Sequence, residues 1–164
     1  MNVNGAVTSF ISAGEVHLPG RPKDAEGVKA LAQVAQRCFS NFRAAGAKVC
    51  AGAPVPELDF DRNFYAALKE IGIRNIGEIG LGTVAKGPDA ARVTGWCREF
   101  GIETIMHTGG PSIAGSHDVT KEDVLEAQPD VVSHINGGPT SISHDAIYEL
   151  CRNATGALEV VHNG

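Results

Sequence analysis

The sequence is poor in aromatic side chains and has no apolar run long enough to cross a membrane. Aromatic residues make up 5% of the 164 positions, and a membrane-spanning helix needs about 20 consecutive apolar residues. The N-terminus also lacks the basic start and apolar core of a secretory signal peptide. These absences argue against a membrane partner and predict a cytoplasmic protein.

Two further absences limit the cofactors and partners to be expected. The four cysteines are scattered and form no Cys-x-x-Cys pair, which argues against zinc held by thiolates and favours reduced thiols. The net charge is −5 and no basic stripe is present, so nucleic acid is not an expected partner. Neither a GxGxxG fingerprint nor a P-loop occurs in the sequence.

What the sequence does contain is an alternation of short apolar runs with amphipathic stretches. Twenty glycines suit the tight turns between such elements. The apolar runs predict buried parallel strands near 6–13, 48–53, 74–79, 103–107, 130–135 and 157–161. The amphipathic stretches predict helices near 24–45, 59–71, 89–100, 120–127 and 143–153.

Alternating strands and helices are typical of two α/β architectures, a (β/α) barrel and an open doubly wound sheet. Periodicity alone does not separate them. Six expected strands are two fewer than a closed eight-stranded barrel requires, and the sequence begins and ends close to a strand. The interpretation favoured here is one partial TIM (β/α)₈ barrel domain over 1–164, with about six parallel strands and without the first and last strands of the barrel.

Three polar residues at nearly equal spacing each close an apolar run. They are Glu78, His107 and His134, separated by 29 and 27 residues, about one strand–loop–helix–loop module each. The carboxyl ends of parallel barrel strands open on one face, where catalytic groups collect. A carboxylate and two imidazoles brought together there predict a catalytic metal site.

Each of these residues also has a structural interpretation. Glu78 could pair with an arginine or lie at a helix N-terminus, because a buried carboxylate needs a partner. His107 or His134 could be a neutral core histidine bonded to a backbone carbonyl. The recurrence of the same placement in three successive modules favours the metal site over three separate structural roles.

The loops that follow the strands hold further candidates. His17 could touch a substrate or be a solvated loop residue, and Asn136 could donate a hydrogen bond to substrate or fix its own turn. The glycine pairs at 109–110 and 137–138 would let the backbone approach a ligand closely.

Five segments of the sequence resemble the enamidases of the amidohydrolase superfamily, which are metal-dependent hydrolases. The resemblance runs in order along essentially the whole chain, and the last of the five segments is long enough to be specific. The segments are Ile11–Gly14, Pro19–Asp24, Gly77–Thr83, Met106–Gly110 and Val131–Pro139.

The resemblance implies a (β/α)₈ barrel whose complete site holds two divalent metals, zinc or iron. Glu78 matches the carboxylate that bridges the two metals, and His107 and His134 match the histidines of the fifth and sixth strands. The His-x-His pair of the family's first strand and the catalytic aspartate of its eighth strand have no counterpart in this sequence. No catalytic residue is therefore assigned, and the chain is expected to be an internal fragment with little activity in isolation.

The resemblance also implies a substrate and an assembly. The substrate would be a cyclic amide or enamide of nicotinate degradation, hydrolysed at its C–N bond by a homotetrameric enzyme. The substrate-binding candidates are His17, Arg21, Thr108 and Asn136, with Arg21 proposed for the substrate carboxylate. Two alternatives remain open, a non-catalytic truncated homologue and a doubly wound α/β domain that binds an anion through its glycine-rich loops. The negative charge of Glu78 argues against phosphate as that anion.

Overall fold

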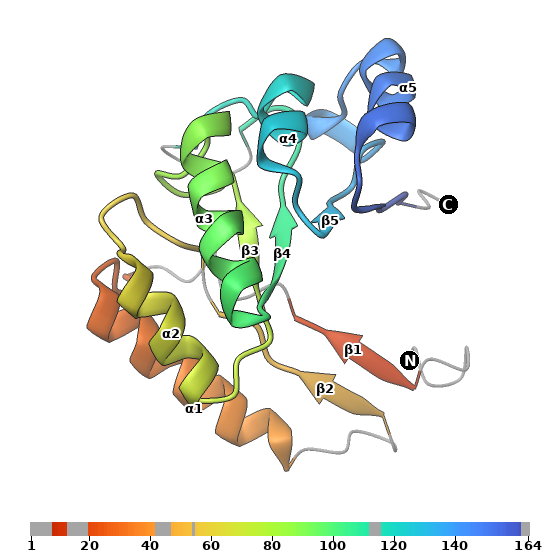
Figure 1. Cartoon of the computed structure of the whole chain (residues 1–164). Coiled ribbons are helices and arrows are strands. Elements are labelled where there is room, and N and C mark those ends of the chain that lie inside the picture. Colours follow the sequence, from red (N-terminus) through yellow and green to blue (C-terminus); the bar gives the residue numbers. More distant parts are fainter. Residues whose placement is uncertain (1–7, 13–19, 42–46, 54, 112–115, 162–164) are drawn as a thin grey trace.

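The computed structural model describes residues 8–12, 20–41, 47–53, 55–111 and 116–161 (Figure 1). Strands and helices alternate along this part of the chain. The strands are β1 (Ser9–Ile11), β2 (Lys48–Cys50), β3 (Asn75–Ile79), β4 (Glu103–Met106), β5 (Val131–Val132) and β6 (Ala157–Leu158). The helices are α1 (Ala25–Ser40), α2 (Arg62–Glu70), α3 (Gly87–Phe100), α4 (Lys121–Ala127) and α5 (His144–Asn153), with a 3₁₀ turn η3 (Gly138–Thr140) before α5.

The strands lie side by side in the order in which they occur in the chain, and every pairing is parallel. β1 pairs with β2, and β3, β4, β5 and β6 form a second run of neighbours. A parallel bridge between Ala53 and Ile76 connects the segment after β2 to β3. A doubly wound sheet reverses its strand order at a switch point, whereas a barrel does not. The strand order therefore confirms the partial barrel.

The predicted elements all occur, but the strands are shorter than the apolar runs suggested. β5 covers only Val131–Val132 of the expected 130–135, because His134 adopts a φ of +37°, which strand geometry does not allow. The first strand was expected over 6–13, of which only part lies within the described residues. The helix expected over 24–45 ends at Ser40.

Side-chain caps explain where the helices begin. Asp24, Asp61 and Ser143 each accept a hydrogen bond from the backbone N–H three residues further on. Thr120 and Asp123 form a reciprocal capping box at the start of α4, as the Thr-x-x-Asp pattern predicted. Each cap satisfies an amide that would otherwise lack a partner, a contribution of about 1 kcal/mol to helix stability.

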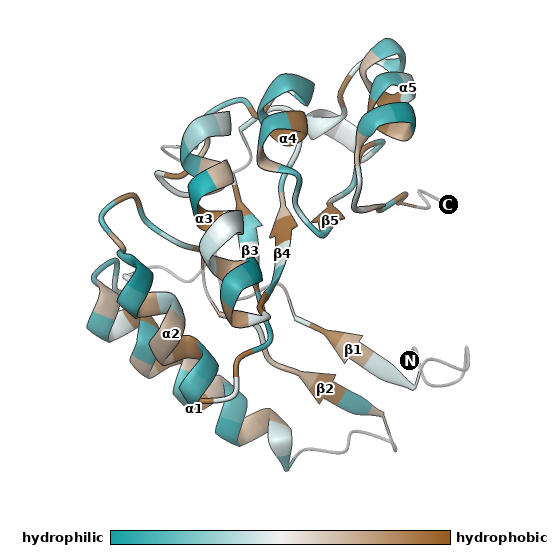
Figure 2. Ribbon diagram, in the orientation of Figure 1, coloured by the Kyte–Doolittle hydropathy of each residue, from teal (hydrophilic) through white to brown (hydrophobic). Residues whose placement is uncertain are grey.

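The strands present one buried face and one open face. Ile76, Met106 and Val132 are fully buried in a core shared with the helices, of which α3 packs on β4 and α1 on β2. Figure 2 shows the resulting contrast between apolar strands such as β4 and β5 and the polar outer sides of the helices. The opposite face borders a cavity of about 230 Å³ lined by Ile11, Glu78, Glu103, Ile105, Val131, Ser133 and Glu159. None of the described helices is both long and apolar enough to span a membrane.

The amino-terminal ends of β4 and β5 are tied together by a side-chain network. The Asp130 carboxylate accepts hydrogen bonds from the backbone N–H and the hydroxyl of Thr104, both at 2.8 Å. Thr104 is fully buried, so its hydroxyl cannot turn to water if Asp130 is removed.

We expect Asp130→Ala to lower the free energy of unfolding by about 2–3 kcal/mol, because it removes two charge-assisted hydrogen bonds. The measurement is urea unfolding with an unchanged denaturant slope. Asp89→Ala is the control, since its ion pair with Arg92 is solvent-exposed and should contribute less than about 1 kcal/mol. Equal losses in the two variants would contradict this account of the strand ends.

Candidate metal centre

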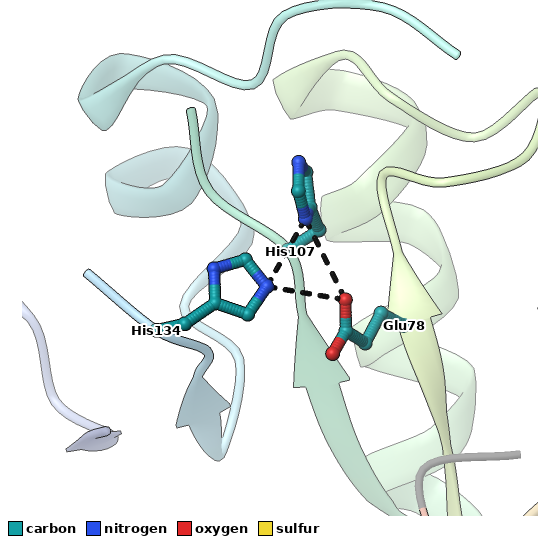
Figure 3. Close-up of side chains that lie close together, drawn as sticks. All are labelled: Glu78, His107 and His134. Atoms are coloured by element: carbon teal, nitrogen blue, oxygen red, sulfur yellow. Dashed lines mark hydrogen bonds and ion pairs between the residues drawn. The ribbon is translucent and has the colours of Figure 1, made fainter. Parts of the chain in front are cut away.

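Glu78, His107 and His134 converge at the carboxyl end of three neighbouring strands (Figure 3). Glu78 lies near the end of β3, His107 directly follows β4, and His134 follows β5 by two residues. The ladder continues past the strand ends, where the His107 amide donates to the Ile79 carbonyl at 2.8 Å. Parallel pairing of neighbouring strands thus brings together three side chains that are far apart in the sequence, as predicted.

The three facing atoms form a nearly equilateral triangle. The Glu78 Oε2 atom lies 3.5 Å from His107 Nδ1 and 3.4 Å from His134 Nε2. The two imidazole nitrogens are 3.2 Å apart. Ligand atoms about 2.0–2.1 Å from one ion at tetrahedral angles would be about 3.3–3.4 Å apart. The residues present therefore fit a single divalent ion.

The ring of His107 is oriented by a backbone carbonyl. Its Nε2 atom lies 2.8 Å from the Gly110 carbonyl oxygen, which can only accept, so Nε2 carries the proton. Nδ1 faces Glu78 and His134, where it donates to the carboxylate when the ring is protonated and offers its lone pair to a metal ion when the ring is neutral. A histidine that donates its other N–H to a carbonyl is the usual arrangement at metal centres, and His107 is 1% exposed.

The glycine pair after His107 brings this carbonyl into place. Gly109 has a φ of +88°, and a Cβ at this position would lie 1.5 Å from the Thr140 carbonyl oxygen. Gly109 also pairs with Val119 through two backbone hydrogen bonds of 2.9 Å. The sequence predicted that this glycine pair lets the backbone approach a ligand. Among the described residues, Gly109 instead approaches the Thr140 backbone closely.

His134 is held differently. Its backbone is in the left-handed region, with a φ of +37°, and its Nε2 atom faces Glu78 and His107. Its Nδ1 atom is buried and has no hydrogen-bond partner among the described residues. The orientation of this ring therefore depends on its backbone rather than on a second bond to the imidazole.

The charges of the cluster are strongly coupled. Burial by itself would raise the pKa of Glu78, but hydrogen bonds from His107 and His134 and their charges outweigh it and lower that pKa to about 2. The hydrogen bond and negative charge of Glu78 raise the pKa of His134 above its ordinary value of 6.5, against the effect of burial. The cluster thus keeps an anionic carboxylate at neutral pH, the form that binds a cation.

Three of the four predicted substrate-binding residues bond to other parts of the chain. The fourth, His17, falls outside the described residues. Arg21 forms a buried ion pair with Glu57 at 2.8 Å, and Glu57 also accepts a hydrogen bond from the Thr83 hydroxyl at 2.7 Å. This network joins the loops that follow β1, β2 and β3. The contact of Arg21 with a substrate stays a prediction.

The other two candidates also bond to the backbone. The buried hydroxyl of Thr108 donates to the Ser133 carbonyl at 2.9 Å. The Asn136 side chain donates to the Val161 carbonyl at 3.0 Å and accepts from the Val161 amide at 2.8 Å. This pairing supplies the turn-fixing role that the sequence left open for Asn136, and its contact with substrate, like that of Thr108, stays a prediction.

The sequence did not predict the groups that orient the side chains of the cluster. The Gly110 carbonyl carries no side-chain signal, and Glu57 lies in a Pro-rich loop with nothing to indicate its partner. Glu159, whose carboxylate accepts a hydrogen bond from the His134 amide at 3.0 Å, follows the last strand by one residue. Like Glu78, it is a carboxylate at the end of a strand, and this pattern could have identified it from the sequence.

In the metal-free protein we expect Glu78→Gln to lower the pKa of His134, because the variant removes the anion that raises it. The measurement is an NMR titration of the His134 imidazole. A raised histidine pKa stabilises the fold below pH 6.5, and a lowered glutamate pKa stabilises it above pH 4.5. The stability lost in Glu78→Gln should therefore be largest between these two values.

Glu103→Gln is the matched control for this titration, because Glu103 lines the same cavity at the other end of the strands. It should leave the His134 titration unchanged. An identical His134 pKa in the wild type and Glu78→Gln would contradict the coupling.

Comparison with known proteins finds similarity in both sequence and structure. No family model matches the chain. The enamidase of Eubacterium barkeri is 45% identical over 162 residues, which cover 99% of this chain and 42% of that enzyme. A crystal structure of enamidase, described as a new member of the amidohydrolase superfamily, superposes with a TM-score of 0.87 at 43% identity over 97% of this chain and 41% of that one.

The chain is thus a homologue of enamidase, within the amidohydrolase superfamily, and spans about two fifths of the length of these relatives. The strand order and the comparison agree on a partial barrel of the amidohydrolase type.

Proposed function

We propose that Glu78, His107 and His134 hold a divalent metal ion and that this ion serves the hydrolysis of a cyclic amide or enamide. The observation that carries the proposal is the triangle of one carboxylate oxygen and two imidazole nitrogens, 3.2–3.5 Å apart. The homology to enamidase supports the reaction class. Because the chain spans only part of that enzyme, its activity, substrate and assembly are proposals here.

The donor set suits zinc or iron better than magnesium or calcium. Two imidazole nitrogens and one carboxylate oxygen are typical ligands of zinc and of non-haem iron(II), whereas magnesium and calcium prefer oxygen. A bound ion would supply Lewis acidity and a water with a pKa of about 7. Among the described residues, no other histidine, cysteine, aspartate or glutamate joins the cluster, so a second ion would need further ligands.

The residues of the chain contribute charge and orientation. The Glu78 carboxylate stays anionic at neutral pH and would offset part of the charge of a bound ion. The Gly110 carbonyl holds the His107 ring so that Nδ1 could bind that ion. The cavity beside Glu78 combines apolar side chains such as Ile105 and Val131 with the carboxylates of Glu103 and Glu159. Such a lining suits the neutral amide part of a substrate ring, and a substrate carboxylate would need a contact elsewhere, for which Arg21 is the candidate. A homotetrameric assembly, cytoplasmic location and a place in nicotinate degradation remain part of the proposal.

Metal binding by the 164-residue chain tests the first half of the proposal. After chelator treatment, we expect isothermal titration with Zn²⁺ or Co²⁺ to show one equivalent bound. Glu78→Gln and His107→Asn should weaken binding at least about tenfold, because each removes one of three ligands. His144→Asn is the control, since His144 starts α5 outside the cluster and should leave the affinity unchanged. Equal affinities in all variants would overturn the site.

Hydrolysis of a cyclic enamide tests the second half. We expect the metal-loaded chain to turn over far more slowly than an enamidase with all its ligands, because the sequence holds neither a His-x-His pair nor the expected aspartate. Turnover at the full enzyme's rate would refute this expectation. Metal binding without any detectable hydrolysis would favour a non-catalytic homologue.

A further inference from the structure

We propose that Glu159 is a positioning residue that holds His134 in the backbone conformation needed for metal binding. The inference rests on the proposed metal site. The Glu159 Oε2 atom accepts a hydrogen bond from the His134 backbone N–H at 3.0 Å. That N–H belongs to a residue with a φ of +37°, in a region that side chains larger than glycine rarely adopt. Glu159 thus acts on His134 through its backbone, and no contact between Glu159 and the imidazole is needed.

The two histidines of the site differ in how their rings are fixed. His107 has a carbonyl, that of Gly110, bonded to the ring nitrogen that faces away from the metal centre. His134 has no equivalent, because its buried Nδ1 atom lacks a partner among the described residues. The direction of His134 Nε2 is consequently set by the backbone from which the side chain projects. The hydrogen bond to Glu159 is what restrains that backbone at the His134 amide.

The contact of Glu159 belongs to a set of hydrogen bonds between two extended segments. The Ile135 amide donates to the Glu159 carbonyl at 3.1 Å, and the Glu159 amide donates to the Val132 carbonyl at 2.9 Å. The Asn136 side chain pairs with both polar backbone atoms of Val161. The segment that carries His134 is therefore anchored on both sides of this residue, and the Glu159 side chain supplies the remaining bond at its amide.

A carboxylate suits this task for two reasons. An ionised acceptor makes a shorter and stronger hydrogen bond to a backbone N–H than a neutral one does. Glu159 is also exposed, so its replacement creates no cavity in the core. Loss of the bond would let the His134 backbone move toward the extended region and turn Nε2 away from Glu78 and His107.

The test compares Glu159→Ala with Glu159→Gln in the 164-residue chain, using Co²⁺ binding and the visible absorption of the bound cobalt. We expect Glu159→Ala to weaken Co²⁺ binding by about tenfold and to change the cobalt spectrum, since orienting groups at metal ligands typically contribute 10–100-fold. Glu159→Gln should bind nearly as well as the wild type, because its amide oxygen still accepts from the His134 amide. Glu103→Ala removes a carboxylate from the same cavity and should leave the Co²⁺ affinity and the cobalt spectrum unchanged.

Two results would overturn the inference. Wild-type affinity in Glu159→Ala would show that the bond does not matter. Equal weakening in Glu159→Ala and Glu159→Gln would show that Glu159 acts through its charge rather than by positioning.

Amide hydrogen exchange of His134 supplies a reading that needs neither metal nor a stable alanine variant. In the metal-free wild type we expect protection of this amide, and in Glu159→Gln we expect it to persist. Exchange as fast as in an exposed loop would overturn the inference. Failure of the wild type to bind Co²⁺, with the amide still protected, would instead count against the proposed function.

Discussion

Parallel pairing of neighbouring strands in chain order is the constraint on which the whole site depends. β3, β4 and β5 are parallel neighbours, and the pairing of β3 with β4 resumes at Ile79 after a register shift that begins at Ile76. Residues at the carboxyl ends of these strands therefore emerge at one edge. Three side chains, each nearly 30 residues from the next, thereby come within 3.5 Å of each other. A shift in this register would separate them, and no local interaction in a loop could bring them back together.

Beyond the strand ends, the site is shaped by groups outside the three-ligand cluster. The Gly110 carbonyl sets the tautomer of His107, and Gly109 permits the loop geometry that brings this carbonyl close. The buried pair of Arg21 and Glu57, extended by Thr83, joins three successive loops on the same edge. Such a pair is costly to bury and is strongly destabilising to break, so it fixes the arrangement of the loops more than it adds to stability. The barrel strands bring the three side chains together, and these loop contacts orient them.

The sequence predicted the order of the elements and the metal cluster because both follow from short-range periodicity and strand-end placement. It did not predict the length of β5, because no local pattern indicates the left-handed backbone of His134 or its hydrogen bond to Glu159. The ion pair of Arg21 was not predicted either, since its partner Glu57 lies 36 residues away in a loop without a motif. Asn136 left two roles open, and the structure supplied a backbone partner for both ends of its amide. Local sequence patterns therefore do not predict which loop residues pair over long distances in the chain.

The central claim is that one ion is held by Glu78 Oε2, His107 Nδ1 and His134 Nε2. The most direct test is an anomalous difference map from crystals of the chain soaked in Zn²⁺, recorded on both sides of the zinc absorption edge. The account predicts one strong peak about 2.0–2.2 Å from each of these three atoms. Zinc bound only at other residues, or bound to His107 through Nε2 with the Gly110 contact broken, would contradict it.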